Sequence, residues 1–233
     1  MLREKYLMNW GLMAVILMMM LGLAGATALG ADIYVDGANA AGPWDGTKEH
    51  PYQYIQDGID NAAINDTVLV AEGTYNENLV WVAKSIALVG ERVDDTIIDG
   101  GNIDCCLIMT NVPETASIEG FTFTHGNGIG GNGGGIFCIT SSPNITDCNF
   151  EENSAGWGGG MCNYLSSPTL NNCSFNDNSA GDSGGGLLNF QSSPVLSNCK
   201  FNGNSALYGG GMDNFINCNP VLSDCKFIGN SAG

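Results

Sequence analysis

Apolar residues in the second half of the chain fall in short bursts that alternate with polar residues, and the bursts recur at a fixed interval. From residue 133 the sequence contains four copies of one repeat unit, which begin with glycine triplets at positions 133, 158, 184 and 209. An aliphatic residue follows each triplet, another follows a proline, and an aromatic residue follows near the end of the unit. Such brief alternation is typical of short β-strands. Each unit therefore predicts several strands joined by turns.

The spacing of the triplets, 25 or 26 residues, selects among repeat architectures. Helical repeats are excluded because every unit holds a glycine triplet, a proline and several asparagines, which are poor residues for helix interiors. Leucine-rich repeats would need regularly spaced leucines that the units lack. A parallel β-helix fits, because each coil of short strands stacks on the last at about 4.8 Å. The sequence predicts an all-β solenoid of this kind.

Equivalent side chains of successive coils are then expected to form columns. The main inward columns would be Cys148, Cys173, Cys199 and Cys225; Phe150, Phe175, Phe201 and Phe227; and Asn153, Asn178, Asn204 and Asn230. Stacked amides would hydrogen-bond along the last of these. Asp147, Asn172, Asn198 and Asp224 precede the cysteines, where a left-handed turn suits Asn and Asp. Asn163, Asn189 and Asn214 would form a shorter column.

These motifs resemble a known repeat. The tandem glycine-glycine-x-aliphatic and FxxN pattern over residues 133–233 is similar to the repeats of the polymorphic outer-membrane protein family. The resemblance implies a parallel β-helix in a secreted or cell-surface setting, often with an adhesive role. This chain departs from the family because no C-terminal barrel sequence follows the repeats.

The first half of the chain is consistent with the same fold. Residues 33–37 predict a strand, and residues 50–62 predict a short amphipathic helix with Tyr54, Ile55 and Ile59 on its apolar side. The following bursts of strand-forming residues resemble the opening of pectin lyase-like and pectin esterase-like proteins. That resemblance, over residues 33–124, implies a right-handed parallel β-helix whose first coil is capped by the helix.

The N-terminus reads as an export signal. Arg3 and Lys5 precede an apolar run at 10–23, and the small residues Ala26 and Ala28 follow it. The run is shorter than the roughly 20 residues of a membrane-spanning helix. We expect a signal peptide at 1–28, a cap with the first coils at 32–125, and four repeats at 126–233. The mature protein would be secreted, periplasmic or on the cell surface, without a membrane span.

The formal net charge of −17 narrows the choice of partners. Beyond the leader the cations are Lys48, Lys84, Arg92, Lys200 and Lys226. So few positive charges exclude nucleic-acid binding and disfavour anionic membrane surfaces. Nine cysteines in an exported chain suggest disulfides, and the coil spacing would allow bridges within the cysteine column. The alternative is a column of buried thiols that fill the core.

The candidate chemistry is sparse. Asp95 and Asp99, with Arg92 beside them, could act as acid, base or Ca²⁺ ligand, or could simply form a solvated turn. His125 lies in a glycine turn, and no nucleophile elbow occurs. Stacked turns with Glu151, Glu152, Asp177 and Asp182 could bind Ca²⁺, but no cofactor is expected. No residues fall at a zinc-binding spacing.

The function expected is therefore a binding, adhesive or structural role toward carbohydrate or another cell-surface component. The alternative is a polysaccharide-active enzyme of the pectate lyase, polygalacturonase or pectin esterase type, and a third is the passenger of a larger surface assembly. The last unit stops at 229–233, where earlier units lead into the next glycine triplet. An open final coil would expose an unpaired edge, as in a fragment of a longer solenoid or in an end that associates with a partner or another copy.

Overall fold

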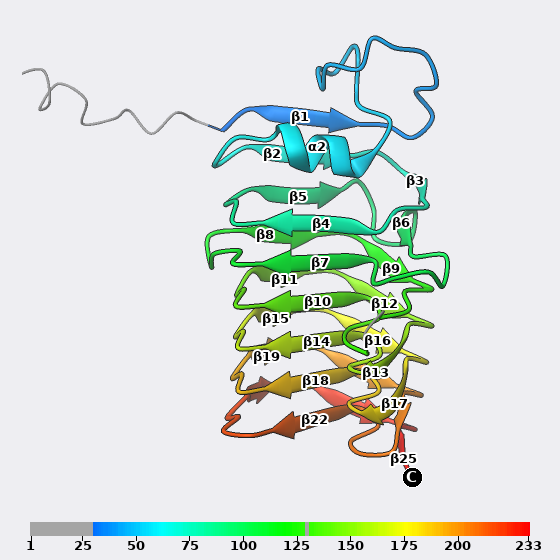
Figure 1. Ribbon diagram of the computed structural model, residues 1–233, viewed down its shortest axis with the longest axis vertical. Coiled ribbons are helices and arrows are strands. Elements are labelled where there is room, and N and C mark those ends of the chain that lie inside the picture. Colours follow the sequence, from blue (N-terminus) through cyan, green and yellow to red (C-terminus); the bar gives the residue numbers. More distant parts are fainter. Residues whose placement is uncertain (1–29, 129–130) are drawn as a thin grey trace, which may run out of the picture.

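The computed structural model describes residues 30–128 and 131–233, which wind repeatedly around one long axis (Figure 1). The expected signal peptide at 1–28 lies outside the described residues. The strands pair in parallel with their counterparts in the coils before and after, and form four sheets along the axis. The predicted parallel β-solenoid is confirmed.

Two sheets contain a strand from nearly every coil. Sheet A consists of β1 (Asp32–Val35), β2 (Thr67–Val70), β5 (Ala87–Gly90), β8 (Ser117–Glu119), β11 (Asn144–Thr146), β15 (Thr169–Asn171), β19 (Val195–Ser197) and β23 (Val221–Ser223). Sheet B consists of β3 (Gly73–Tyr75), β6 (Thr96–Asp99), β9 (Thr122–Thr124), β12 (Asn149–Glu151), β16 (Ser174–Asn176), β20 (Lys200–Asn202) and β24 (Lys226–Ile228).

The other two sheets lie next to each other on the side of the solenoid that faces the viewer in Figure 1. Sheet C consists of β4 (Leu79–Val82), β7 (Leu107–Thr110), β10 (Ile136–Ile139), β14 (Met161–Tyr164), β18 (Leu187–Phe190) and β22 (Met212–Phe215). Sheet D is confined to the repeats and consists of β13 (Ser154–Trp157), β17 (Ser179–Ser183), β21 (Ser205–Ala206) and β25 (Ser231–Ala232).

The core is a set of stacked side chains. The rings of Phe150, Phe175 and Phe201 follow one another at centroid distances of 4.5 and 4.6 Å and are nearly parallel. Phe227 continues the stack at 4.6 Å, but 46% of it is exposed because no further described coil covers it. Burial of one aromatic ring per coil supplies much of the apolar area that holds the coils together.

The glycine triplets have a steric explanation. Gly158 has φ +66°, a left-handed conformation that L-residues other than glycine rarely adopt. A Cβ atom on Gly159 would lie 2.4 Å from the carbonyl oxygen of Ser179, and one on Gly160 would lie 2.6 Å from that of Gly186. The first glycine thus turns the chain, and the next two leave room for the backbone of the following coil.

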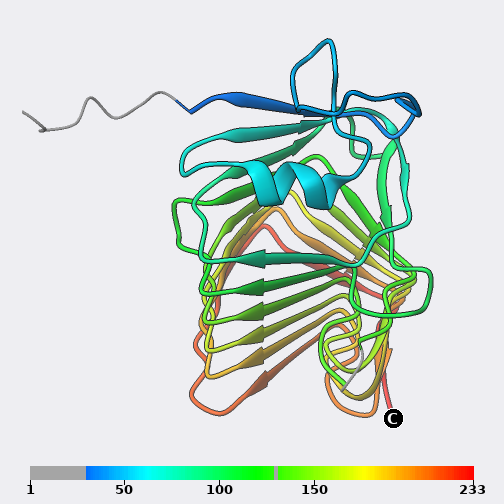
Figure 2. The same cartoon turned by 45° about the horizontal axis from the view of Figure 1, so that its top comes forward.

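The predicted short helix is present but shorter, as α2 (Ile55–Asn61), and lies across the N-terminal end of the solenoid against β1, β2 and β4 (Figure 2). Ile55 and Ile59 are buried as expected. Tyr54 is not part of the apolar face: it precedes the helix and is 54% exposed. The apolar side of the helix begins at Ile55, because Tyr54 has an extended backbone conformation.

Two charged side chains fix the ends of α2. The carboxylate of Glu77 accepts hydrogen bonds from the backbone N–H groups of Ile55 and Gln56, at 2.8 and 3.0 Å. The ammonium group of Lys84 donates to the backbone carbonyls of Ile59 and Asp60, at 2.8 and 2.7 Å. These contacts place a negative charge at the positive end of the helix and a positive charge at its negative end.

All nine cysteines are free thiols in the structure, and seven of them are buried. Within the column, the Cys148 thiol donates to the carbonyl of Thr146, and burial raises its pKa to about 12. Cys105 and Cys106 are adjacent but both buried. A thiol held protonated in this way behaves as a small apolar filler.

Candidate functional site

The acidic segment predicted around residue 95 does not form a single cluster. Arg92 pairs with Glu72 at 2.9 Å and with Asp95 at 2.5 Å, and all three side chains are largely exposed. Asp99 lies at the end of β6 and faces a different partner. The structure thus separates Asp99 from the Arg92–Asp95 pair, which occupies a solvated turn.

Asp99 contacts His125, which sits in the next coil just after β9. The imidazole Nδ1 lies 3.1 Å from Asp99 Oδ2, and its Nε2 lies 3.4 Å from Glu152 Oε2 in the coil beyond. The hydrogen bond to Asp99, assisted by the charge of Glu152, raises the pKa of His125 above its ordinary value. A histidine held between two carboxylates could take up or release a proton near neutral pH.

The sequence contained a signal for this group. Asp99, His125 and Glu152 are each about one coil apart, so extending the repeat period upstream would have placed them on neighbouring coils. The three residues nevertheless differ in type and place, because Asp99 is the last residue of β6 whereas His125 and Glu152 follow β9 and β12, and this hides the correspondence.

The other carboxylates considered for Ca²⁺ are dispersed. Glu151 accepts a hydrogen bond from the Asn176 amide, whereas Asp182 lies on β17 of sheet D and accepts one from Trp157. In residues 30–128 and 131–233, no three His, Cys, Asp or Glu side chains are grouped as ligands for a metal ion. Lys200 and Lys226 are in register on the outer face of sheet B, beside the phenylalanine stack.

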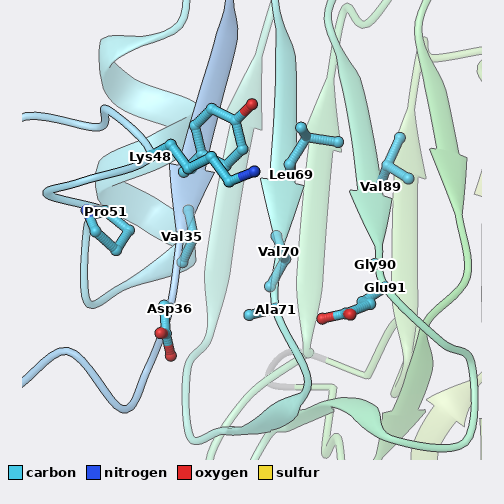
Figure 3. A pocket seen from close by; sticks show the side chains of 11 residues that line it. Val35, Asp36, Lys48, Pro51, Leu69, Val70, Ala71, Val89, Gly90 and Glu91 are labelled. Atoms are coloured by element: carbon cyan, nitrogen blue, oxygen red, sulfur yellow. The ribbon is translucent and has the colours of Figure 1, made fainter.

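A pocket with a volume of about 370 Å³ lies near the N-terminal end, on the outer face of sheet A (Figure 3). Its floor consists of Tyr34, Leu69 and Val89, which are in register on β1, β2 and β5. The charged residues around it are Asp36, Lys48 and Glu91. It offers an apolar floor with charges of both signs, without a paired acid and base.

The outer face of sheet C carries an exposed aromatic strip. Tyr164 and Phe190 stack at 4.9 Å with an interplanar angle of 11°, and Phe215 follows Phe190 at 5.7 Å, tilted by 40°. Tyr164 is 38% exposed, whereas Phe190, between Tyr164 and Phe215, is half-buried. Phe215 is 51% exposed. An exposed apolar strip that continues over three coils is a candidate interaction surface.

Sheet D forms a wall beside this strip. Trp157, at the end of β13, is 41% exposed, and its indole N–H donates to Asp182 Oδ2 at 2.7 Å. A narrow cleft of about 40 Å³ runs between this wall and sheet C. We call it the aromatic trough; it is lined by Trp157, Asp182, Ser183, Leu188, Phe190 and Phe215.

The aromatic trough was missed at the sequence level. The aromatic residues at 164, 190 and 215 are in phase with the repeat, and that phase was the available signal. Trp157 has no such signal, because the equivalent position of the next coil is Ser183.

Comparisons with known proteins address the fold. A family model described as the right-handed beta helix region matches residues 93–233. Among solved structures, a pectin methylesterase in complex with hexasaccharide VII is similar, with a TM-score of 0.50 and 12% identity, over 87% of this chain and 67% of the other. At that identity the likeness concerns the fold alone. No curated protein matches the chain.

The described residues contain no helix that is long and apolar enough to cross a membrane.

Proposed function

The chain belongs to the right-handed beta-helix family, and on that premise we propose that it is an exported binding protein whose ligand is a polysaccharide. The observation that carries this proposal is the aromatic trough. Sugar rings combine apolar C–H faces with hydroxyl groups, so a site for them needs apolar or aromatic surface beside a few hydrogen-bonding groups. Trp157 and Phe215 supply exposed aromatic surface, and the Asp182 carboxylate supplies an acceptor.

The setting of the protein is part of the proposal. The N-terminal sequence has the pattern of a signal peptide, and the repeats resemble those of polymorphic outer-membrane proteins. Both features support a secreted, periplasmic or cell-surface location with a binding or adhesive role. Polysaccharides are the main structural polymers of cell surfaces, which makes them a natural ligand class there.

The test is retention of the purified mature protein on insoluble or immobilised cellulose, xylan, mannan and polygalacturonate. We expect retention on at least one of them, and a loss of at least tenfold in affinity for Trp157→Ala. The matched control is Trp44→Ala, because Trp44 is similarly exposed at 48% but lies in the loop before α2. Failure to bind any polymer would contradict polysaccharide binding. Equal effects of Trp157→Ala and Trp44→Ala would show that the trough is not the binding site.

A second candidate function, a polysaccharide lyase, hydrolase or esterase, is favoured by the grouping of Asp99, His125 and Glu152. His125 would serve as acid or base, with Asp99 orienting its ring. The assay is release of reducing ends, unsaturated products or methanol from pectate and methylated pectin, with and without Ca²⁺. Turnover that is lost in Asp99→Asn and His125→Asn, but kept in Asp95→Asn, would establish the enzyme in place of the binding protein.

A further inference from the structure

We infer that the polysaccharide bound in the aromatic trough is uncharged, such as a neutral glucan, xylan or mannan, and not an acidic polymer. This inference rests on the proposed function and narrows its ligand class. It follows from how the few cations and the nearby carboxylates are distributed over the described coils.

No cation reaches the trough from the strands that build it. The described strands of sheets C and D contain no Lys, Arg or His. Arg92 is engaged by Glu72 and Asp95, and Lys84 donates to backbone carbonyls of α2. The remaining three are Lys48 near the sheet A surface, and Lys200 and Lys226 on sheet B. An anionic sugar in the trough would therefore find no counter-charge.

The one charged residue that lines the trough is negative. Asp182 lines it, and the half-buried Asp213 is the register neighbour of Leu188 on its floor. Asp182 already accepts the indole N–H of Trp157, so its charge is held in place. A uronate carboxylate close to these groups would be repelled, and the net charge of −17 adds to the repulsion. Sugar hydroxyls, in contrast, can donate to the same carboxylates.

The shape of the surface fits a polymer. The apolar strip continues from coil to coil through Tyr164, Phe190 and Phe215, in register on three neighbouring strands. A chain of sugars can contact this strip along the solenoid axis, whereas one monosaccharide would cover only a small part of it. Several weak contacts along one polymer raise the overall affinity without any deep pocket.

The experiment compares neutral and acidic polymers on the same mature protein. Binding to xylan, glucan, mannan and polygalacturonate is measured by affinity electrophoresis at 0.05 and 0.5 M NaCl. We expect the preferred neutral polymer to bind at least tenfold more tightly than polygalacturonate at low salt. Its own affinity should change less than twofold between low and high salt. High salt should reduce the difference in affinity between neutral and acidic polymers, because it screens the repulsion. The screening length falls from about 10 Å at 0.1 M to about 3 Å at 1 M.

Asp182→Asn tests the cause directly, because asparagine keeps an oxygen that can accept the indole N–H but removes the charge. We expect this substitution to raise the affinity for polygalacturonate at least threefold at low salt, and so to reduce the ratio of neutral to acidic polymer affinity. An unchanged polygalacturonate affinity would overturn the role of Asp182.

The remaining outcomes separate the two proposals. Tighter binding of polygalacturonate than of every neutral polymer at low salt, still lost in Trp157→Ala, would refute the neutral ligand and leave polysaccharide binding intact. Binding to no polymer at all would refute both. Self-association that disappears in Trp157→Ala, measured by sedimentation, would show instead that a second copy of the chain occupies the trough. The comparison of polymers uses the unsubstituted protein, so it stands even if a variant fails to fold.

Discussion

The side-chain amide of Asn178 donates from Nδ2 to Oδ1 of Asn204 in the next coil, at 2.9 Å. The same Nδ2 donates to the carbonyl of Phe150 at 2.8 Å, and Asn178 Oδ1 accepts from the backbone N–H of Asn153 at 3.1 Å. One buried amide therefore joins three coils and satisfies the N–H of Asn153, which lies between β12 and β13.

Replacing this amide should destabilise the solenoid. Asn178→Ala leaves the buried Asn153 N–H without its partner and removes the hydrogen bonds to the Phe150 carbonyl and Asn204, so we expect a loss of about 2–4 kcal/mol in the free energy of unfolding. Asn202→Ala is the control, because Asn202 is exposed on sheet B, and it should cost less than about 0.5 kcal/mol. Urea melts of both variants measure the difference. Equal costs would show that the amide column contributes little.

The phenylalanine stack should dominate the stability of the repeats. Phe175 is fully buried between Phe150 and Phe201, so Phe175→Ala should cost about 3–5 kcal/mol. Lys200, exposed on the neighbouring strand, should tolerate alanine at under about 0.5 kcal/mol. Denaturant melts that gave comparable losses for both would contradict the inward placement of the aromatic column.

His125 should make stability depend on pH. Its pKa is raised in the folded protein by the hydrogen bond to Asp99, with Glu152 as the second facing carboxylate. The protonated form is therefore favoured by folding. Its contribution is fully present below the unfolded pKa of about 6.5 and is lost as pH rises through the higher folded pKa.

His125→Asn is the variant of choice, because asparagine tolerates the positive φ of 50° at this position. The stability difference between the unsubstituted protein and this variant should be larger at pH 5.5 than at pH 8.5, measured by thermal or urea melts at both pH values. Parallel curves for the two proteins would show that the His125 contacts do not influence folding.

The N-terminal sequence predicts processing on export. The secreted protein should begin near Leu29, after Ala28, because small residues at 26 and 28 suit signal peptidase. N-terminal sequencing or intact mass of the exported protein measures the start. A membrane-bound species that retains Met1 would contradict the prediction.

Local pattern was sufficient to predict most of the scaffold. The interval between glycine triplets, the alternation around each Phe and the asparagines of the FxxN motif are periodic, and periodicity determines which side chains stack when coils are superposed. The register Phe175 to Phe201 follows directly from it. The exact helix start did not follow, because it depends on Glu77, which contacts the helix from a distant part of the sequence.

The sequence by itself thus determined the repeat, its strands and the residues of its inward columns, because a period of one coil imposes the same environment on every copy. Only the tertiary structure decided that Asp99 meets His125 rather than Arg92, and that Trp157, Phe190 and Phe215 line one trough. These contacts join different columns. They depend on where the end of β6 and the turn after β9 place their side chains, and on how sheet D lies beside sheet C, which the periodic pattern does not encode.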